Sequence, residues 1–232
     1  MRCSHGFAVA LAATLAVPAM AGAQDASRAV AGGGISAAGW MGKVDANEAQ
    51  RGGKIEDTKM VTMGPGLHVT TGPAAVYWSA ANTASGNYTV EATFSEREYM
   101  GLNDHPHPYG LFIGGNDMGS DNQSLLYCAA YGNGSFIVRG FAPAPFQLNG
   151  RRGETNDAVN KAAAKGQSVT QKIAMRVSAD KVECLINDKV VGTYAKTDVV
   201  GAGKLKSTDG IYGLRFGHNT DAHIAGLKMT KN

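Results

Sequence analysis

Residues 87–95 read NYTVEATFS, and apolar and polar side chains alternate strictly along this stretch. The tyrosine, valine, alanine and phenylalanine occupy every second position. Because successive side chains of a β-strand point to opposite faces, this period of two predicts a strand with one face toward a core and the other toward water. Such a strand needs a sheet around it and a second layer against its apolar face.

Further strand patterns, separated by turn residues, lie on both sides of this stretch. Asn187-Asp188 and Gly132-Asn133-Gly134 are typical of tight hairpin turns, because these residues tolerate a positive φ. With residues 87–95 there are eleven candidate strands, and the other ten are 67–71, 74–79, 109–115, 123–131, 135–141, 172–178, 181–186, 189–194, 211–217 and 222–229. Only residues 157–165 show a helical pattern. The sequence therefore predicts an all-β fold, a two-sheet antiparallel sandwich with minimal helix.

The composition fits an ordinary globular domain and excludes several classes of protein. Hydrophobic residues make up 44% of the 232 positions and charged residues 18%, which is too polar for a polytopic membrane protein. The 31 glycines are nearly double the usual share of about 7%, which indicates many turns and disfavours long helical bundles. The net charge is only +3 and no long run of like charge occurs, so we expect no nucleic-acid partner.

The N-terminal segment has the three parts of a secretory signal peptide. Arg2 precedes an apolar stretch at residues 7–17, and Ala21-Gly22-Ala23 resembles a cleavage site. This apolar stretch is shorter than the roughly 20 residues that a membrane-spanning helix needs. We therefore expect residues 1–23 to be removed from a secreted or periplasmic protein without a membrane span. Residues 24–38 predict a flexible glycine-rich lead-in, and residues 39–232 a single β-sandwich domain.

Two cysteines, Cys128 and Cys184, lie in the predicted domain. In an oxidising compartment they can form one disulfide. Alternatively, they are two small buried thiols in strands, since a domain of this size has enough core without a bridge. The second interpretation is favoured.

The sequence lacks the common catalytic and cofactor-binding motifs. There is no G-x-S-x-G, H-E-x-x-H, C-x-x-C or P-loop motif, and no E-x-D-x-E strand of the kind that jelly-roll glycosidases use. The sequence therefore assigns no enzyme class and predicts no cofactor. Glu96 and Glu98 flank Arg97 and can be a catalytic acid and base, but alternating charges at a strand end favour a solvated edge.

His105 and His107, next to Asp104, form the densest group of candidate metal ligands. An H-x-H pair on an extended segment points both imidazoles to the same side, which is suitable for a divalent metal ion. The alternative is a surface loop stiffened by Pro106 and Pro108. This alternative is favoured, so we expect no metal and a role for the histidines in binding a polar ligand.

Two irregular segments, residues 97–108 and 114–123, flank the short predicted strand 109–113 and can reach a common pocket over one face of it. Hydroxyl-rich ligands suit short amide, carboxylate and aromatic side chains, although wide turns and strand cores have a similar composition. Tyr127 and Arg139 lie on neighbouring predicted strands, where they can form a stacking platform. The predicted ligand-binding residues are His105, His107, Tyr109, Asn116, Asp117, Asn122, Tyr127 and Arg139.

The C-terminal third resembles a known family. Residues 209–219 (DGIYGLRFGHN) and 223–229 (HIAGLKM) resemble the closing hairpin of concanavalin-like, laminin-G-type jelly rolls, especially an exported bacterial group related to 3-keto-disaccharide hydrolases. Residues 182–194 resemble the preceding hairpin of that group and 109–113 its central strand. The resemblance implies a curved jelly roll, an exported location and a carbohydrate ligand beside the concave sheet.

These observations favour an exported domain that binds a carbohydrate or another small polar ligand. One alternative is a hydrolase or lyase that acts on modified glycosides, with His105 or His107 as general base. Another alternative is a structural or protein-binding module of the cell envelope.

Overall fold

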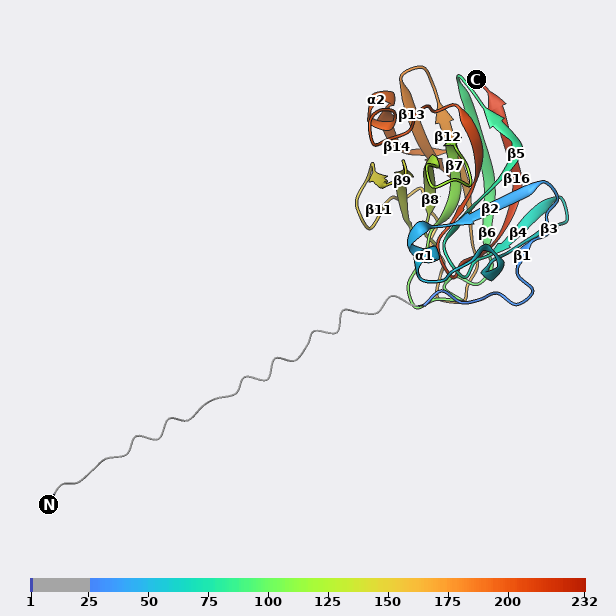
Figure 1. The fold of residues 1–232 in the computed structure, drawn as a ribbon, viewed down its shortest axis with the longest axis vertical. Helices are drawn as coiled ribbons and strands as arrows, with labels where there is room; N and C mark the ends of the chain where they lie inside the picture. Colours follow the sequence, from blue (N-terminus) through green and yellow to red (C-terminus); the bar gives the residue numbers. More distant parts are fainter. Residues whose placement is uncertain (2–25) are drawn as a thin grey trace.

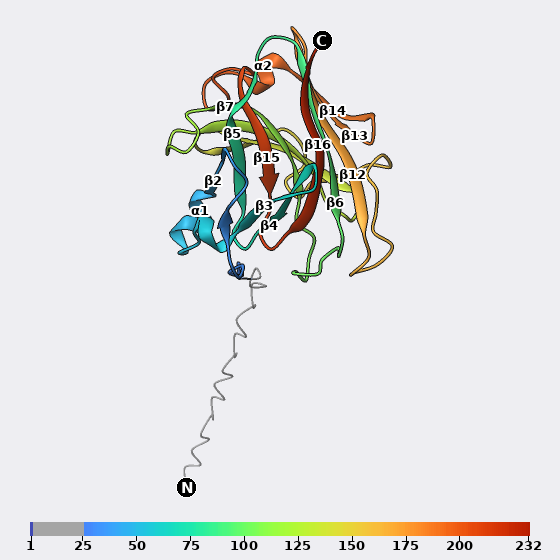
Figure 2. The same ribbon diagram turned by 90° about the vertical axis from the view of Figure 1, so that its right-hand side faces the viewer.

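The computed structural model describes Met1 and residues 26–232, which form two β-sheets packed face to face (Figures 1 and 2). Apart from Met1, the predicted signal segment lies outside the described residues. The first sheet contains, in spatial order, β1 (Gly34–Ile35), β3 (Lys59–Met63), β4 (Gly66–Thr70), β16 (Asp221–Lys231), β6 (Tyr88–Glu96), β12 (Val169–Val177), β13 (Lys181–Ile186) and β14 (Lys189–Ala195).

The second sheet contains, in spatial order, β10 (Pro145–Gln147), β9 (Ser135–Phe141), β8 (Ser124–Ala130), β7 (Tyr109–Asn116), β15 (Gly210–Phe216), β5 (Ala75–Ala84) and β2 (Trp40–Val44), and β11 (Glu154–Thr155) pairs with β9. The pairs within both sheets are antiparallel except β1 with β3. The helical elements are short: α1 (Ala46–Gln50), α2 (Lys196–Val199) and the 3-10 turn η1 (Ile55–Asp57). The predicted two-sheet antiparallel sandwich is therefore confirmed. In the described part of the chain, every helix is too short to cross a membrane.

Residues 157–165, predicted to be helical, contain no helix. The side-chain amide of Asn160 donates to the carbonyl of Thr170 at 2.7 Å, and its backbone N–H donates to Gln171 Oε1 at 3.0 Å. The next residue, Lys161, forms an isolated β-bridge with Asn133. These contacts hold the segment against β12 and the turn before β9, so tertiary hydrogen bonds override a weak local helix preference.

The core lies between the two sheets, and the alternation in residues 87–95 is confirmed because its four apolar side chains are at most 2% exposed. The Phe94 ring stacks on Tyr109 with centroids 5.7 Å apart, and Phe216 lies 6.2 Å from Phe94. Tyr109, predicted to bind ligand, is fully buried in this core. Its inward direction follows from its place on β7, where the odd positions 109, 111 and 113 face the first sheet.

Cys128 on β8 and Cys184 on β13 form a disulfide that joins the second sheet to the first, with Cα atoms 5.9 Å apart. The favoured interpretation of two free thiols is therefore wrong. Both side chains point into the core. Strand alternation predicts that inward direction, but it does not predict which inward positions of two sheets face one another.

The glycine-rich segment expected to be a flexible lead-in contributes β1, which adds a short parallel strand to the edge of the first sheet. The backbone N–H of Val30 donates to the carbonyl of Asp57, and Ala37 is buried in the core. Part of the segment 24–38 is therefore built into the sandwich.

Candidate functional site

The outer face of the second sheet, turned away from the first sheet, has an apolar floor of its own. Seven buried residues form this outer cluster: Val76, Trp78, Phe112, Leu125, Tyr127, Ala129 and Ile137. On β8 they alternate with inward-facing residues, so Tyr127 and Ala129 lie on the opposite face of the strand from Cys128.

Arg215 projects from β15 onto this floor and is paired with Asp45, which follows β2. Its Nη2 lies 2.6 Å from Asp45 Oδ2, and the two groups form a bidentate ion pair. The guanidinium lies 5.2 Å from the centre of the Tyr127 ring and 5.6 Å from that of Phe141, within the range of cation–π attraction. Desolvation lowers the pKa of Arg215, but the charge of Asp45 and its hydrogen bonds, together with Tyr127, more than offset this and raise the pKa. The cation is therefore held in one place.

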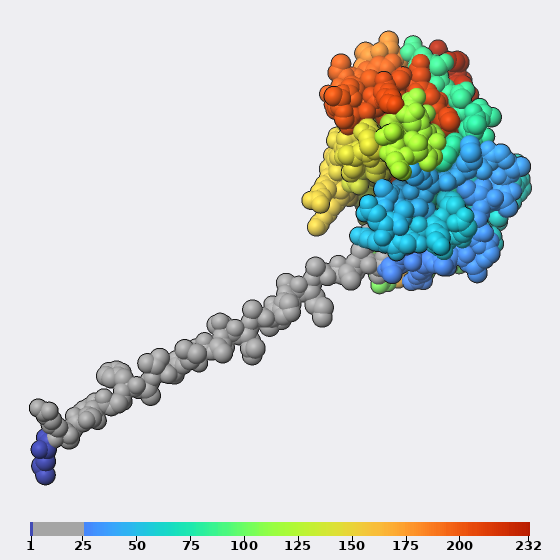
Figure 3. All heavy atoms as spheres, viewed as in Figure 1, coloured from blue at the N-terminus to red at the C-terminus, as the bar shows by residue number. Residues whose placement is uncertain are grey.

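A cavity of about 820 Å³ lies beside this floor, lined by Arg215 and by Phe141, which packs against the outer cluster, and we call it the outer-face cavity. The lining comes from α1, the loop 117–123, β9 and the start of β10. Its charged and aromatic side chains are Lys43, Asp45, Asp121, Arg139, Phe141 and Arg215. Figure 3 shows the cyan α1 region, the lime-coloured loop 117–123 and the yellow segment after β9 meeting on one side of the molecule. Charged, amide and aromatic groups thus surround one hollow.

Two side chains at the edge of the outer-face cavity are held by hydrogen bonds. Lys43 Nζ donates to the carbonyl of Ser120 at 2.6 Å and to Asp121 at 3.2 Å, which ties β2 to the loop 117–123. Arg139 Nη2 donates to Gln147 Oε1 and to the carbonyl of Arg151, both at 3.2 Å. Arg139 is therefore directed by neighbouring groups while its side chain remains partly exposed.

The sequence-predicted site residues do not form one group. Tyr127 and Arg139 lie together on the outer face, and the loop 117–123 contributes Ser120, Asp121 and Gln123 to the cavity beside them. The segment 97–108 lies at the opposite end of β7 from that loop. Since a strand of eight residues is about 26 Å long, the two loops are held apart.

Asn116, Asp117 and Asn122 lie at the far end of β7 beside α2 and the loop that follows it. Asn116 Nδ2 donates to the carbonyls of Gly114 and Asp209, both at 3.1 Å, so it holds two loops together. Asp117 forms an ion pair with Lys206. Asp117 and Asn122 line a separate cavity of about 440 Å³. Their observed contacts are with the protein's own loops.

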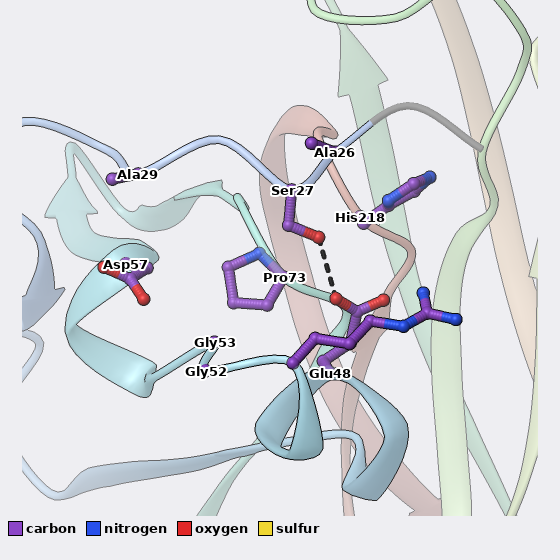
Figure 4. Close-up of a pocket in the computed structure, with 10 residues that line it drawn as sticks. Ala26, Ser27, Ala29, Glu48, Gly52, Gly53, Asp57, Pro73 and His218 are labelled. Atoms are coloured by element: carbon purple, nitrogen blue, oxygen red, sulfur yellow. Dashed lines mark hydrogen bonds between the residues drawn. The ribbon is translucent and has the colours of Figure 1, made fainter. Parts of the chain in front are cut away.

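His105 and His107 meet a third histidine, His218, which follows β15. The candidate ligand nitrogens of these three residues lie within 4.8 Å of one another, and we call them the histidine cluster. His218 also lines a cavity of about 510 Å³, together with Ser27 and Glu48. Figure 4 shows His218 at one side of this cavity and Glu48 accepting a hydrogen bond from the Ser27 hydroxyl, 2.7 Å long.

Glu96 is not on a solvated strand edge, so the favoured interpretation of that residue is wrong. It ends β6, which lies in the interior of the first sheet between β16 and β12, and it is only 7% exposed. Burial raises its pKa to about 7. Glu98, two residues further, is exposed.

Three functional candidates were not predicted from the sequence: Asp45, Arg215 and His218. The sequence could have indicated Arg215, because it is the one charged residue in the predicted strand 211–217. It could not have indicated Asp45 or His218, since each follows a strand in a loop and meets its partners only through the fold.

No family model matches the chain, and no curated protein matches it. Among solved structures, the carbohydrate-binding module CBM66 from Bacillus subtilis is 12% identical and matches with a TM-score of 0.54 over 83% of this chain and 96% of its own. A Bacillus subtilis protein of unknown function with a galectin-like fold is also 12% identical. It matches with a TM-score of 0.55 over 83% of this chain and 89% of its own. The mannose- and Ca²⁺-bound exoplasmic domain of VIP36 is 10% identical with a TM-score of 0.50, over 84% and 83%. The chain therefore has the concanavalin- and galectin-like sandwich fold.

Proposed function

We propose that this protein binds a carbohydrate in the outer-face cavity. The observation that carries the proposal is the pairing of an aromatic ring with directed cations: Phe141, Arg139 and Arg215 all line the cavity, and Asp45 holds Arg215 in place. Two proteins with a similar fold, CBM66 and VIP36, are described as a carbohydrate-binding module and as a mannose-bound domain. Fold likeness supports the class of ligand, and the cavity supports the place.

Sugars combine hydroxyl groups with apolar faces of C–H bonds, and the cavity offers a partner for each. The exposed part of the Arg139 guanidinium can donate to ring hydroxyls. The carboxylate of Asp121 can accept hydrogen bonds from them. The Phe141 ring is partly buried beside Tyr127, with the two rings stacked at 6.1 Å, and it presents an apolar surface for a sugar face.

Replacing Arg139 by alanine should weaken binding of the sugar that the protein recognises by at least about tenfold, because a hydrogen bond from a charged group contributes about 1.5–3 kcal/mol. A glycan array identifies the ligand, and titration calorimetry with that glycan measures the affinity of each variant. Arg176→Ala is the matched control, since Arg176 is a half-exposed strand arginine on the first sheet. Equal affinities of wild type and Arg139→Ala, or an equal loss in both variants, would place the ligand elsewhere.

We also propose that the protein is exported, on the strength of the signal-like pattern in residues 1–23. Intact-mass analysis of secreted or periplasmic material should then show a mature chain that begins at Gln24. A full-length chain that starts at Met1 and stays in the cytoplasm would refute this.

The finer resemblance to 3-keto-disaccharide hydrolases stays a prediction, and so do the hydrolase and envelope-module alternatives. A hydrolase that uses His105 or His107 as general base would lose turnover in the double variant His105→Ala, His107→Ala. A sugar-binding domain that uses the outer-face cavity would keep its glycan affinity in the same variant.

A further inference from the structure

We propose that the histidine cluster, His105, His107 and His218, binds one first-row transition-metal ion such as Zn²⁺. The three residues come from two loops more than a hundred positions apart in the chain, yet their ligand nitrogens lie within 4.8 Å of one another. None of the three histidines lines the outer-face cavity, so the proposal stands independently of sugar binding.

The spacing of the nitrogens fits a shared ion. Zn²⁺ binds imidazole nitrogens at about 2.0–2.1 Å, so two nitrogens of a tetrahedral site lie about 3.3 Å apart. His107 Nε2 and His218 Nε2 are 2.6 Å apart, and the centres of the His105 and His107 rings are 4.4 Å apart. The separations of the candidate ligand nitrogens, none above 4.8 Å, thus differ from the tetrahedral value by about 1.5 Å or less.

The backbone beneath the cluster holds the two loops together. The backbone N–H of Gly217 donates to the carbonyl of Pro108 at 2.7 Å, which joins the residues next to His218 and His107. The side chain of Asn103 donates to the carbonyls of His218 and Asn219, at 3.3 and 2.7 Å. The approach is so close that a Cβ on Gly217 would lie 3.0 Å from the Cβ of His107. The histidines are therefore brought together before any ion arrives.

The chemistry of the donors selects the kind of ion. Three imidazoles suit zinc, copper, nickel or iron, whereas Ca²⁺ and Mg²⁺ prefer oxygen ligands. His218 is buried, His107 is intermediate and His105 is exposed, so the cluster extends from the protein interior to solvent. The cavity that His218 lines and the exposed side of His105 give an ion a route to the site.

Untagged full-length chain, freed of metal, should bind one Zn²⁺ per molecule in titration calorimetry and equilibrium dialysis. His107→Ala and His218→Ala should each weaken binding by more than about 100-fold, since even the loss of a ligand's own hydrogen-bond partner costs about 10- to 100-fold. His223→Ala is the matched control, because this histidine lies on β16 outside the cluster and should leave the affinity unchanged.

X-ray absorption of the Zn²⁺-loaded protein should give imidazole nitrogens as the main ligands at about 2.0–2.1 Å. If His218→Ala does not fold, His105→Ala replaces it, since His105 is exposed. A wild-type chain that binds no stoichiometric Zn²⁺ overturns the proposal. So does a folded His105→Ala or His107→Ala variant with wild-type affinity, or a loss of equal size in His223→Ala.

Discussion

Reducing the disulfide between Cys128 and Cys184 should lower the free energy of unfolding by about 4 kcal/mol. The two cysteines are 56 positions apart, and the bridge removes from the unfolded chain the many conformations that such a loop would otherwise sample. In a domain of this size, that loss corresponds to a decrease in Tm of about 8–16 °C. Thermal unfolding followed by circular dichroism, with and without a reductant, measures it.

The double variant Cys128→Ala, Cys184→Ala is the control. It has no bridge to reduce, so the reductant should leave its Tm unchanged and close to that of the reduced wild type. Labelling of unfolded, unreduced wild type with a thiol reagent should leave Cys128 and Cys184 unmodified. Labelling of both residues, or an equal effect of reductant on both proteins, would contradict the prediction.

Replacing Glu96 by glutamine should raise the free energy of unfolding by up to about 3 kcal/mol at pH 8 and change this free energy little at pH 4. Glu96 is 7% exposed, and burial raises the pKa of its carboxyl to about 7. A hydrogen bond from the backbone N–H of Met100 lowers this pKa, and the charge of Asp221 raises it. Tyr99 and Tyr109 also lie close enough for the Glu96 charge to raise their pKa values.

The direction of the pH effect depends on whether the folded or the unfolded chain holds the proton of Glu96 more tightly. Between a pH of about 4.5, where the unfolded chain loses it, and about 7, the folded protein keeps a proton on Glu96. Stability therefore falls as pH rises through this window, by about 1.4 kcal/mol per unit, and the loss is complete above it. Glutamine does not ionise, so the variant should lack this slope.

Urea unfolding at pH 4, 6 and 8 gives the free energies for this comparison. Glu91→Gln is the control, because Glu91 lies on the same strand but is more exposed and forms ion pairs with Lys172 and Lys228. The stabilisation by Glu96→Gln should grow with pH, whereas removing the ion-paired charge of Glu91 should give no such stabilisation. Parallel curves for wild type and Glu96→Gln would show that Glu96 does not titrate in this window.

The strands could be predicted because each carries its own alternation and its own turns. Asn187 and Asp188 have φ values of 49° and 65°, as the hairpin prediction requires. β2 and β3 were missed: β2 is only five residues long and contains Gly42, where a side chain would collide with Tyr77. Gly42 interrupts the alternation of side chains along β2, and a glycine is needed there because Tyr77 on β5 lies so close.

The candidate site was harder to predict because its parts meet only in three dimensions. Alternation gives the two faces of each strand separately, but the shared face of Tyr127 and Arg139 follows from the register in which β8 pairs with β9. The same rule, applied to β7, turns Tyr109 inward, but the two loops beside it suggested a pocket there. The approach of His218 to His107 depends on β15 pairing with β7, which the sequence of neither strand specifies.

The position of β16 has a consequence for how the chain is made. This last strand of the described chain lies inside the first sheet, with β4 on one side and β6 on the other. During synthesis or translocation the N-terminal residues emerge first, yet β4 and β6 have no shared neighbour until residues 221–231 have also emerged. The first sheet therefore closes last, and until then β4 and β6 each expose an unpaired edge, which needs protection from pairing with another chain.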